Sequence, residues 1–466
     1  MAIVNLGILA HVDAGKTSLT ERILFETGVI DAIGSVDKGT TQTDTLELER
    51  TRGITIKSAV ASFQLGSLTV NLIDTPGHAD FVAEVERSLR VLDAVVLVIS
   101  AVEGVQPQTR RLLAAIRAAG LPVMIFVNKI DRLGARGDEL LDDIRRKLNL
   151  RVVPLTVAIG AGDRDASVTC RDRDDPVWRA AAADLLAETS ETVIAEFDRS
   201  NGAIGRSFLE AELRAQVAAG EAAPLFFGSA ITGAGVPELL AGIEEWLPRA
   251  EIAEGPLDAE IFKIARRPSG EKIVYARVFA GRLAVRERIA AQRVGEAEPV
   301  EERVTGIDRF VTGGTEAAAA VSAGEIAGLH GLREARIGDR LGAGATRDRA
   351  PSRAFQEPAL ESVVQPVDPG QIIRLRAALE QLAEQDPLIS LRQSNEDGEI
   401  SVRLFGEVQK EVLTETLTLD YGVSVTFGPS RVICVERPTG VGEHSEIMGE
   451  AGNPFAATVG FRVEPG

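Results

Sequence analysis

The 466-residue chain has few cysteines, few aromatic residues and no excess of positive charge. Its two cysteines, Cys170 and Cys434, lie far apart, which excludes a disulfide framework and the paired spacing of a zinc site. We therefore expect a reducing, cytoplasmic environment. Aromatic residues make up only 4% of the chain, so aliphatic side chains and alanine must fill its cores.

The net charge of −18 argues against non-specific binding to nucleic acid, because the phosphate backbone would repel the protein. It leaves room for local basic patches and for basic protein partners in a ribonucleoprotein. Apolar runs such as residues 94–102 are too short to cross a bilayer. The apolar N-terminus has no basic region or cleavage site, so we expect a first strand there and no contact with membranes.

Residues 10–17 read Ala-His-Val-Asp-Ala-Gly-Lys-Thr, between an apolar run (3–9) and a helical pattern. A strand, a tight loop and a helix N-terminus direct backbone N–H groups at phosphates. Lys16 would reach the outer phosphates, Thr17 would bind Mg²⁺, and a side chain at Gly15 would collide with the nucleotide. The predicted phosphate-binding residues are Asp13, Ala14, Gly15, Lys16, Thr17 and Ser18.

Two further segments fit a site that responds to a third phosphate. Residues 31–53 predict a long mobile loop, and Thr55 after it would be a second magnesium ligand that is present only with a triphosphate. An apolar strand (68–73) ends in Asp74-Thr75-Pro76-Gly77-His78. Asp74 would hold Mg²⁺ through water, the Gly77 N–H would bond the γ-phosphate, and His78 would lie near the attacking water. A lone histidine is otherwise more often a surface or core residue.

A base-binding motif follows the next strands. The strand expected at 94–100 and the helix at 106–119 precede an apolar strand at 122–127 that ends in Asn128-Lys129-Ile130-Asp131. The Asp131 carboxylate can accept both N1–H and the N2 amine of guanine, a pair that adenine lacks, so the motif disfavours an ATPase. Asn128 and Lys129 would brace and cover the base. After a strand at 225–228, the backbone of Ser229 and Ala230 would bond guanine O6.

These motifs follow predicted strands in order, which indicates a P-loop GTPase with a doubly wound α/β sheet in residues 1–250. Residues 155–223 predict an inserted subdomain.

Short alternating runs in residues 256–350 indicate a β-barrel: 273–279, 283–289, 302–307 and 325–329. Residues 357–435 follow a βαββαβ order, typical of a ferredoxin-like α+β domain: strands at 359–365, 388–393, 399–404 and 423–427, helices at 369–384 and 407–419, and a hairpin turn at 395–398. Residues 436–466 are too short for a core and would begin an incomplete fourth domain.

Taken together, the motifs at 10–17, 52–56, 74–78 and 128–131 resemble those of the translational GTPases. The domain order resembles elongation factor G and the tetracycline-resistance ribosomal protection proteins. Three segments resemble the protection proteins more: 406–412, 435–438 and 453–455. An elongation factor G-like translocase is the first alternative.

The resemblance implies Mg²⁺-dependent hydrolysis of GTP to GDP, stimulated by the ribosome. His78 would position water beside the large-subunit RNA, Val12 and Ile54 would be the apolar gate that restrains it, and Asp13 would stabilise charge near the phosphates. No arginine finger is evident in these motifs. We expect a monomer that binds the ribosomal factor site, with its RNA and stalk proteins.

The resemblance implies a family pattern that continues through the rest of a fourth domain and a fifth, and on this resemblance we expect residues 436–466 to be only the start of the fourth. We therefore expect nucleotide binding to survive and drug displacement or translocation by this chain to be doubtful. A nucleotide-dependent ribosome-binding module without efficient turnover is the remaining alternative.

Overall fold

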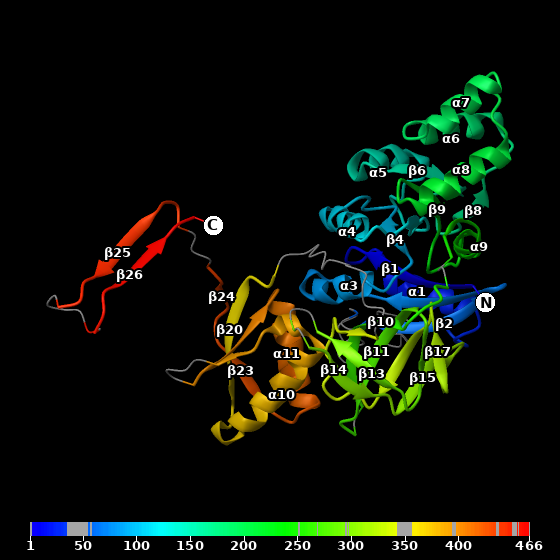
Figure 1. Cartoon of the computed structure of the whole chain (residues 1–466). Coiled ribbons are helices and arrows are strands. Elements are labelled where there is room, and N and C mark those ends of the chain that lie inside the picture. Colours follow the sequence, from blue (N-terminus) through cyan, green and yellow to red (C-terminus); the bar gives the residue numbers. More distant parts are fainter. Residues whose placement is uncertain are drawn as a thin grey trace.

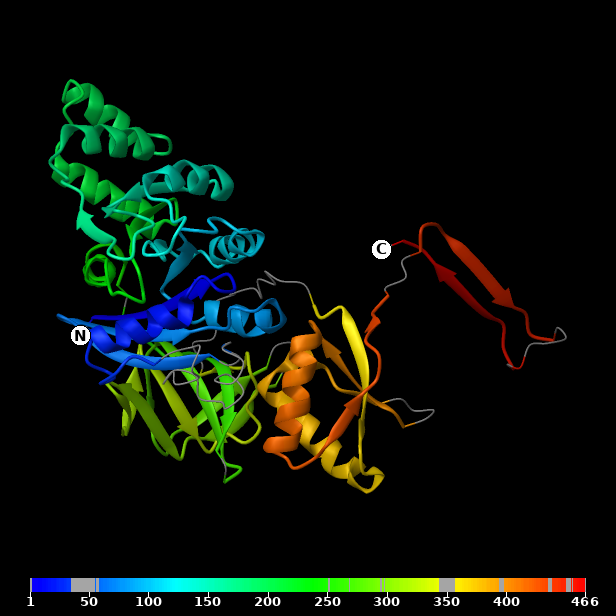
Figure 2. The same cartoon turned by 180° about the vertical axis from the view of Figure 1, so that it is seen from behind.

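The computed structural model describes residues 2–34, 55, 58–249, 252–267, 269–293, 296, 298–342, 357–393, 398–434, 438–449, 454 and 456–465. Figures 1 and 2 show two adjoining α/β and β domains, a smaller α+β domain beside them, and a hairpin that stands clear of all three. The mobile loop predicted at 31–53, the turn predicted at 395–398 and Ile54 lie wholly or largely outside the described residues.

The first domain is built on a seven-stranded sheet in the order β2-β3-β1-β4-β5-β9-β6. All neighbouring strands are parallel except β2, which pairs antiparallel with β3. All seven residues of β4 are buried, as expected of a strand covered on both faces. The strands are β1 (Ala2–Ala10), β2 (Ala59–Leu65), β3 (Leu68–Asp74), β4 (Ala94–Ser100), β5 (Val123–Asn128), β6 (Arg151–Pro154) and β9 (Ala222–Phe227).

Helices cover both faces of this sheet, which is the predicted doubly wound arrangement. One apolar cluster contains Leu19 and Ile23 from α1 (Lys16–Glu26) and Ile243 from α9 (Val236–Trp246). The other contains residues of α3 (Val82–Leu89), α4 (Pro107–Ala118) and α5 (Leu141–Leu148). The carboxyl ends of β1, β3 and β5 therefore open between two packed layers, where an α/β sheet binds its ligand.

The segment after β6 adds a hairpin and three helices to this core. They are β7 (Thr156–Ile159), β8 (Ser167–Cys170), α6 (Pro176–Ala187), α7 (Glu191–Arg199) and α8 (Arg206–Ala218). Trp178 donates from Nε1 to the Pro154 carbonyl at 3.0 Å, and Leu186 and Leu213 belong to the apolar cluster of α1 and α9. The insertion thus packs as an extension of the main core.

The second domain is a β-barrel with one apolar core. Its eight-stranded antiparallel sheet has the order β14-β13-β19-β10-β11-β18-β15-β16, and β12 pairs with β17. The strands are β10 (Asp258–Arg266), β11 (Lys272–Ala280), β12 (Arg282–Ala284), β13 (Arg288–Gln292), β14 (Val300–Arg303), β15 (Gly306–Val311), β16 (Gly314–Ala317), β17 (Ala320–Ser322), β18 (Ile326–His330) and β19 (Arg340–Leu341).

Two strands expected in this domain were wrong, because each spans a turn. Residues 283–289 divide between β12 and β13 at Arg286, whose φ of 74° is left-handed, and residues 302–307 divide between β14 and β15. At the first turn the pairing partners change, since β12 pairs with β17 whereas β13 pairs with β14 and β19. At the second, β14 pairs with β13 whereas β15 pairs with β16 and β18.

The third domain has the predicted βαββαβ order. Its elements are β20 (Leu360–Pro366), α10 (Ile372–Gln385), β21 (Arg392–Gln393), β22 (Ile400–Leu404), α11 (Glu407–Leu419) and β23 (Val425–Phe427), and β24 (Arg431–Val432) pairs with β20. The strand order β21-β22-β20-β23 is ferredoxin-like. The strand expected at 388–393 is mostly wrong, since residues 387–389 form a 3₁₀ turn in which Asp386 accepts from the Leu388 N–H.

A hairpin of β25 (Gly442–Glu446) and β26 (Val459–Val463) ends the described chain, and its side chains are almost all exposed. Among the described residues, no helix has both the length and the apolar character needed to cross a membrane. Cys170 and Cys434 are exposed free thiols.

Candidate functional site

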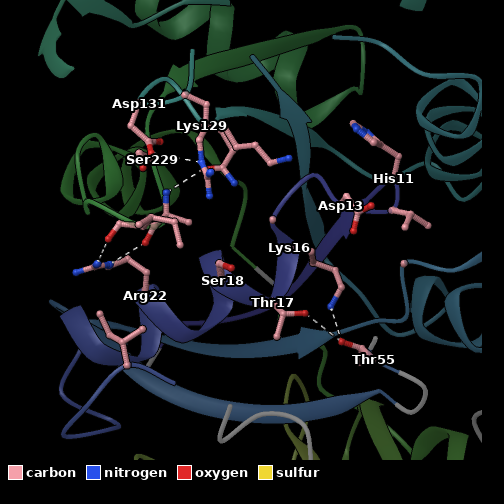
Figure 3. A pocket seen from close by; sticks show the side chains of 18 of the residues that line it. His11, Asp13, Lys16, Thr17, Ser18, Arg22, Thr55, Lys129, Asp131 and Ser229 are labelled. Carbon is pink, nitrogen blue, oxygen red and sulfur yellow. Dashed lines mark hydrogen bonds and ion pairs between the residues drawn. The ribbon is translucent and has the colours of Figure 1, made fainter. Parts of the chain in front are cut away.

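One pocket of about 490 Å³ gathers residues from every predicted nucleotide motif. It lies where β1, β5 and β9 end, and Figure 3 shows side chains entering it from the loops that follow these strands and from α1. The predicted residues that line it are Val12, Asp13, Gly15, Lys16, Thr17, Ser18, Thr55, Gly77, His78, Asn128, Lys129, Asp131, Ser229 and Ala230. Ala14 and Asp74 are buried beside it.

The loop between β1 and α1 needs a glycine at its last position. Gly15 has a left-handed φ of 89°. A Cβ built on it would lie 2.4 Å from Nδ2 of Asn128. A larger residue would therefore clash with the protein itself, and not only with a nucleotide as the sequence suggested.

Lys16 is held under the loop by two oxygen-bearing side chains, those of Asp74 and Thr55. Its ammonium group forms a buried ion pair with Asp74 and donates to Thr55 Oγ1 at 3.2 Å. Thr17 Oγ1 lies 3.2 Å from the same Thr55 hydroxyl, and Thr20 donates to the Asp74 carboxylate at 3.3 Å. The three predicted magnesium ligands, Thr17, Thr55 and Asp74, are thus brought together around one lysine.

At the other end of the pocket, Asn128 joins two loops. Its Nδ2 donates to the Ala14 carbonyl at 2.8 Å, and its Oδ1 accepts from the Ala230 N–H at 2.9 Å. The Ser229 N–H donates to the Ala234 carbonyl at 2.8 Å. Since both N–H groups expected to bond guanine O6 have protein partners, O6 recognition would require one of them to be shared.

Asp131 carries the most informative atom of the pocket. Its side chain is 8% exposed, and its Oδ1 is buried with no hydrogen-bond partner in the described part of the chain. Leaving a buried carboxylate oxygen unpaired costs free energy, so such an atom marks a place where a ligand donor fits. Lys129 lies beside it with a left-handed φ of 70° and an ion pair to Glu103 at 3.5 Å.

His78 is half-buried at the rim, with its Nδ1 accepting from the Asp80 N–H at 3.1 Å. Val12 is 40% exposed in the same pocket. Gln108 of α4 joins Val12 to Gly77, the residue before His78: its side-chain amide accepts from the Val12 N–H at 3.2 Å and donates to the Gly77 carbonyl at 2.5 Å.

Sequence reasoning missed three residues here. Gln108 is the first, and Arg22 of α1 is the second: its Nε donates to the Ala230 carbonyl at 3.0 Å and its guanidinium also reaches the Ile231 carbonyl. The third is His11, which is buried and lies 3.1 Å from the Thr109 hydroxyl; burial lowers the pKa of its imidazole. Arg22 lies one helical turn after Ser18, which indicated from the sequence that it is near the pocket. Its partners could not be found in this way, because they lie some 200 residues away.

The described residues include no group of three or more histidine, cysteine, aspartate or glutamate side chains able to hold a metal ion by themselves. Two hydroxyls and one carboxylate nevertheless converge near Lys16. This is a hard-oxygen donor set, and Mg²⁺ characteristically combines one or two such protein ligands with substrate phosphates and water. The residues present therefore fit Mg²⁺ bound together with a nucleotide.

Comparison with known families decides the identity of this arrangement. Residues 1–249 match the model of the elongation factor Tu GTP binding domain, and residues 355–429 match domain III of elongation factor G. The chain belongs to the translational GTPases. As a member of the elongation factor G-like group of this family, it is a GTP-binding and GTP-hydrolysing protein, as the sequence predicted.

Three relatives show how far this translational GTPase resembles known members. It is 48% identical to an oxytetracycline resistance protein of Streptomyces rimosus, over 94% of this chain and 67% of the relative. It is 33% identical to elongation factor G 2 of Treponema pallidum, over 92% of this chain and 69% of that protein. A crystal structure of a Thermus thermophilus protein superposes with a TM-score of 0.79 at 26% identity, covering 100% of this chain and 73% of that one.

Proposed function

We propose that this protein is a Mg²⁺-dependent, ribosome-stimulated GTPase of the ribosomal protection type. The observation that carries the proposal is the pocket itself, with a lysine at one end and a buried, unsatisfied carboxylate oxygen at the other. A guanosine triphosphate presents negative phosphates at one end and a pair of N–H donors at the other. Among the common bases, guanine alone offers this pair of N–H donors.

Base selection rests on Asp131. Its carboxylate would accept from N1–H and N2–H of guanine, so its buried oxygen gains the donor that it lacks in the protein. Asn128 holds the surrounding loops together through Ala14 and Ala230. The Lys129 side chain would cover the base, while Ser229 and Ala230 form the wall beside it.

Phosphate binding rests on the loop of Asp13, Ala14 and Gly15 with the start of α1, where Lys16, Thr17 and Ser18 follow. The N–H groups of this helix terminus favour anions. Thr17, Thr55 and Asp74 would hold Mg²⁺, which neutralises charge on the phosphates as the terminal bond breaks. Lys16 would then leave Asp74 for the phosphates.

Hydrolysis would be assigned to His78. Its ring lies at the pocket rim near Gly77, whose N–H would bond the γ-phosphate. Val12, with Ile54 as its expected partner, would restrain the imidazole until the ribosome completes the site, and Asp13 would stabilise charge nearby. This division of labour suits phosphoryl transfer, which depends chiefly on positioning and on charge neutralisation.

The ribosome would be the partner that starts the reaction. Two kinds of ribosomal factor are candidates, and the higher identity to an oxytetracycline resistance protein than to elongation factor G 2 favours protection over translocation. On this reading the full activity would free ribosomes from tetracycline in the cytoplasm, with the protein acting as a monomer.

The test is phosphate release from GTP, measured with and without ribosomes. We expect ribosomes to accelerate release by the wild-type protein and His78→Ala to abolish the acceleration while GTP still binds. Binding with a single turnover would favour the ribosome-binding module instead. Two further assays separate the factor types: a protection protein rescues translation in the presence of tetracycline, whereas a translocase promotes translocation. If ribosomes do not accelerate phosphate release by the wild-type protein, the proposal is contradicted.

A further inference from the structure

Helix α11 of the third domain has no cap of its own. Its N-cap residue is Gly406, which offers no side chain. The Val408 and Gln409 N–H groups instead donate to Oδ2 of Asp80, at 3.0 and 3.2 Å. Asp80 belongs to the first domain and comes two residues after His78. A carboxylate of the GTPase domain thus caps a helix of another domain, an arrangement that the helix dipole favours.

The glycine at position 406 is explained by this contact. Its φ of −173° is extended backbone that any residue can adopt. A Cβ built there would lie 2.3 Å from Oδ2 of Asp80. The carboxylate, and not the backbone conformation, therefore excludes a side chain at this position.

The same aspartate holds the imidazole of His78. The Asp80 N–H donates to His78 Nδ1 at 3.1 Å, and Asp80 Oδ1 lies 3.4 Å from that nitrogen. The Asp80 side chain is only 13% exposed. One partly buried residue thus contacts the helix terminus and the histidine at the same time.

A second set of contacts keeps the two domains in this register. Arg87 of α3 pairs with Asp386, at the end of α10, at 2.9 Å. Asp386 also accepts from the Gln409 side chain at 3.4 Å. The segment from His78 to Arg87 is therefore attached to the third domain near the first turn of α11 and near the last turn of α10.

We propose that Asp80 is a positioning residue through which the docking of the third domain sets the orientation of His78. This inference rests on the proposed function, because it concerns the same histidine. If α11 moves away, the Asp80 carboxylate loses the two N–H donors that attach it to the third domain. The turn of residues 79–81 is then no longer held in this arrangement, and His78 loses the partner of its Nδ1. The position of the third domain thereby determines whether His78 is oriented for hydrolysis.

The test changes the third domain and leaves the GTPase domain intact. Gly406→Ala places a methyl group against Asp80 and should displace its carboxylate. We expect GTP affinity to stay within about twofold and ribosome-stimulated single-turnover hydrolysis to slow about tenfold, within the usual range of coupling between sites. Gly428→Ala is the matched control in the same domain, because a Cβ there meets no atom closer than 3.6 Å; its hydrolysis rate should be unchanged.

Substitutions of Asp80 complete the design. Asp80→Ala should slow hydrolysis as Gly406→Ala does, whereas Asp80→Asn retains an oxygen acceptor for the helix N–H groups and should restore part of the rate. The double variant Asp80→Ala/Gly406→Ala should be no slower than Asp80→Ala alone, since both changes break one link. Thermal melting of each variant reports on stability alone.

A purely structural role would lower the melting temperature of Gly406→Ala without changing its single-turnover rate. That result, or additive effects in the double variant, would overturn the inference while the proposed function stands. If wild-type protein does not hydrolyse GTP on ribosomes, the proposed function fails and the inference falls with it. The wild-type rate separates the two failures.

Discussion

The ammonium group of Lys16 is paired with the carboxylate of Asp74 beneath the phosphate loop, with side-chain exposures of 6% and 2%. Each group is the other's charge partner in a place that water scarcely reaches. A triphosphate bound at the loop would compete for the lysine, and Mg²⁺ would take its place at the aspartate. The pair thus links the binding of the phosphates at Lys16 to the binding of Mg²⁺ at Asp74.

The pair leads to a stability prediction. Lys16→Ala leaves the Asp74 carboxylate buried without its cation, which should lower the free energy of unfolding of the nucleotide-free protein by about 3–5 kcal/mol. The double variant Lys16→Ala/Asp74→Ala removes the stranded charge and should recover part of the loss. Urea denaturation in EDTA measures both. A double variant that is less stable than Lys16→Ala would contradict the assignment of the cost to an unpaired charge.

Asp131 gives a prediction about base selectivity. Asp131→Asn replaces an acceptor by a donor, so GTP affinity should fall by about 100-fold or more, and xanthosine triphosphate should become the preferred ligand. Competition binding with both nucleotides measures the change. Asp143→Asn, on the surface of α5 beside Lys147, is the matched control and should leave selectivity unaltered. Retained preference for GTP in Asp131→Asn would remove the base-reading assignment.

Arg22 gives a prediction about nucleotide release. Its guanidinium fixes the carbonyls of Ala230 and Ile231, so Arg22→Met should loosen this wall and speed GDP release about tenfold. Arg22→Lys keeps the charge but not the planar guanidinium, so its rate of GDP release should lie between those of the wild-type protein and Arg22→Met. Stopped-flow release of a fluorescent GDP analogue measures the rates. Release from Arg22→Met at the wild-type rate would show that the wall holds without the arginine.

The β-barrel contains a histidine whose effect on stability depends on pH. Nδ1 and Nε2 of His330 lie 2.8 Å from Glu271 and 2.9 Å from Asp308. Burial alone would lower the pKa of His330, but the two carboxylates outweigh it and raise the pKa above its ordinary 6.5. Because the folded state holds this proton more tightly, the stabilisation is complete below pH 6.5 and is lost as pH rises through the raised value.

His330→Gln should therefore flatten the fall in melting temperature that accompanies rising pH in the wild-type protein. Thermal melts of both proteins from about pH 5.5 to about pH 8.5 span this titration and measure the difference. His444→Gln, in the exposed hairpin, is the control and should follow the wild-type curve. If His330→Gln retains the full pH dependence, the two carboxylates do not control the titration.

Local sequence patterns predicted much of this molecule. The strand at 94–100 and the helix at 407–419 have the predicted bounds. The motif residues of the pocket follow strands whose carboxyl ends must meet in a parallel sheet. Their gathering in one pocket is therefore a consequence of order along the chain.

Long-range docking was not predictable in the same way. The edge strand β2 was missed, since its alternation is weak and its place depends on pairing with β3. The contact of Asp80 with Val408 joins residues 328 positions apart, and Arg22 reaches Ala230 across 208. The periodicity of apolar residues along the sequence does not indicate such partners. They become visible only when the elements of the first domain, and the first and third domains, are packed against one another.

The central claim is that one pocket selects guanosine triphosphate. Isothermal titration calorimetry of the folded wild-type protein with Mg²⁺, using GTP and then ATP, tests it most directly. The account predicts uptake of one GTP per chain and no measurable uptake of ATP at the same concentration. Folded protein that takes up no GTP, or that binds ATP equally well, would contradict it.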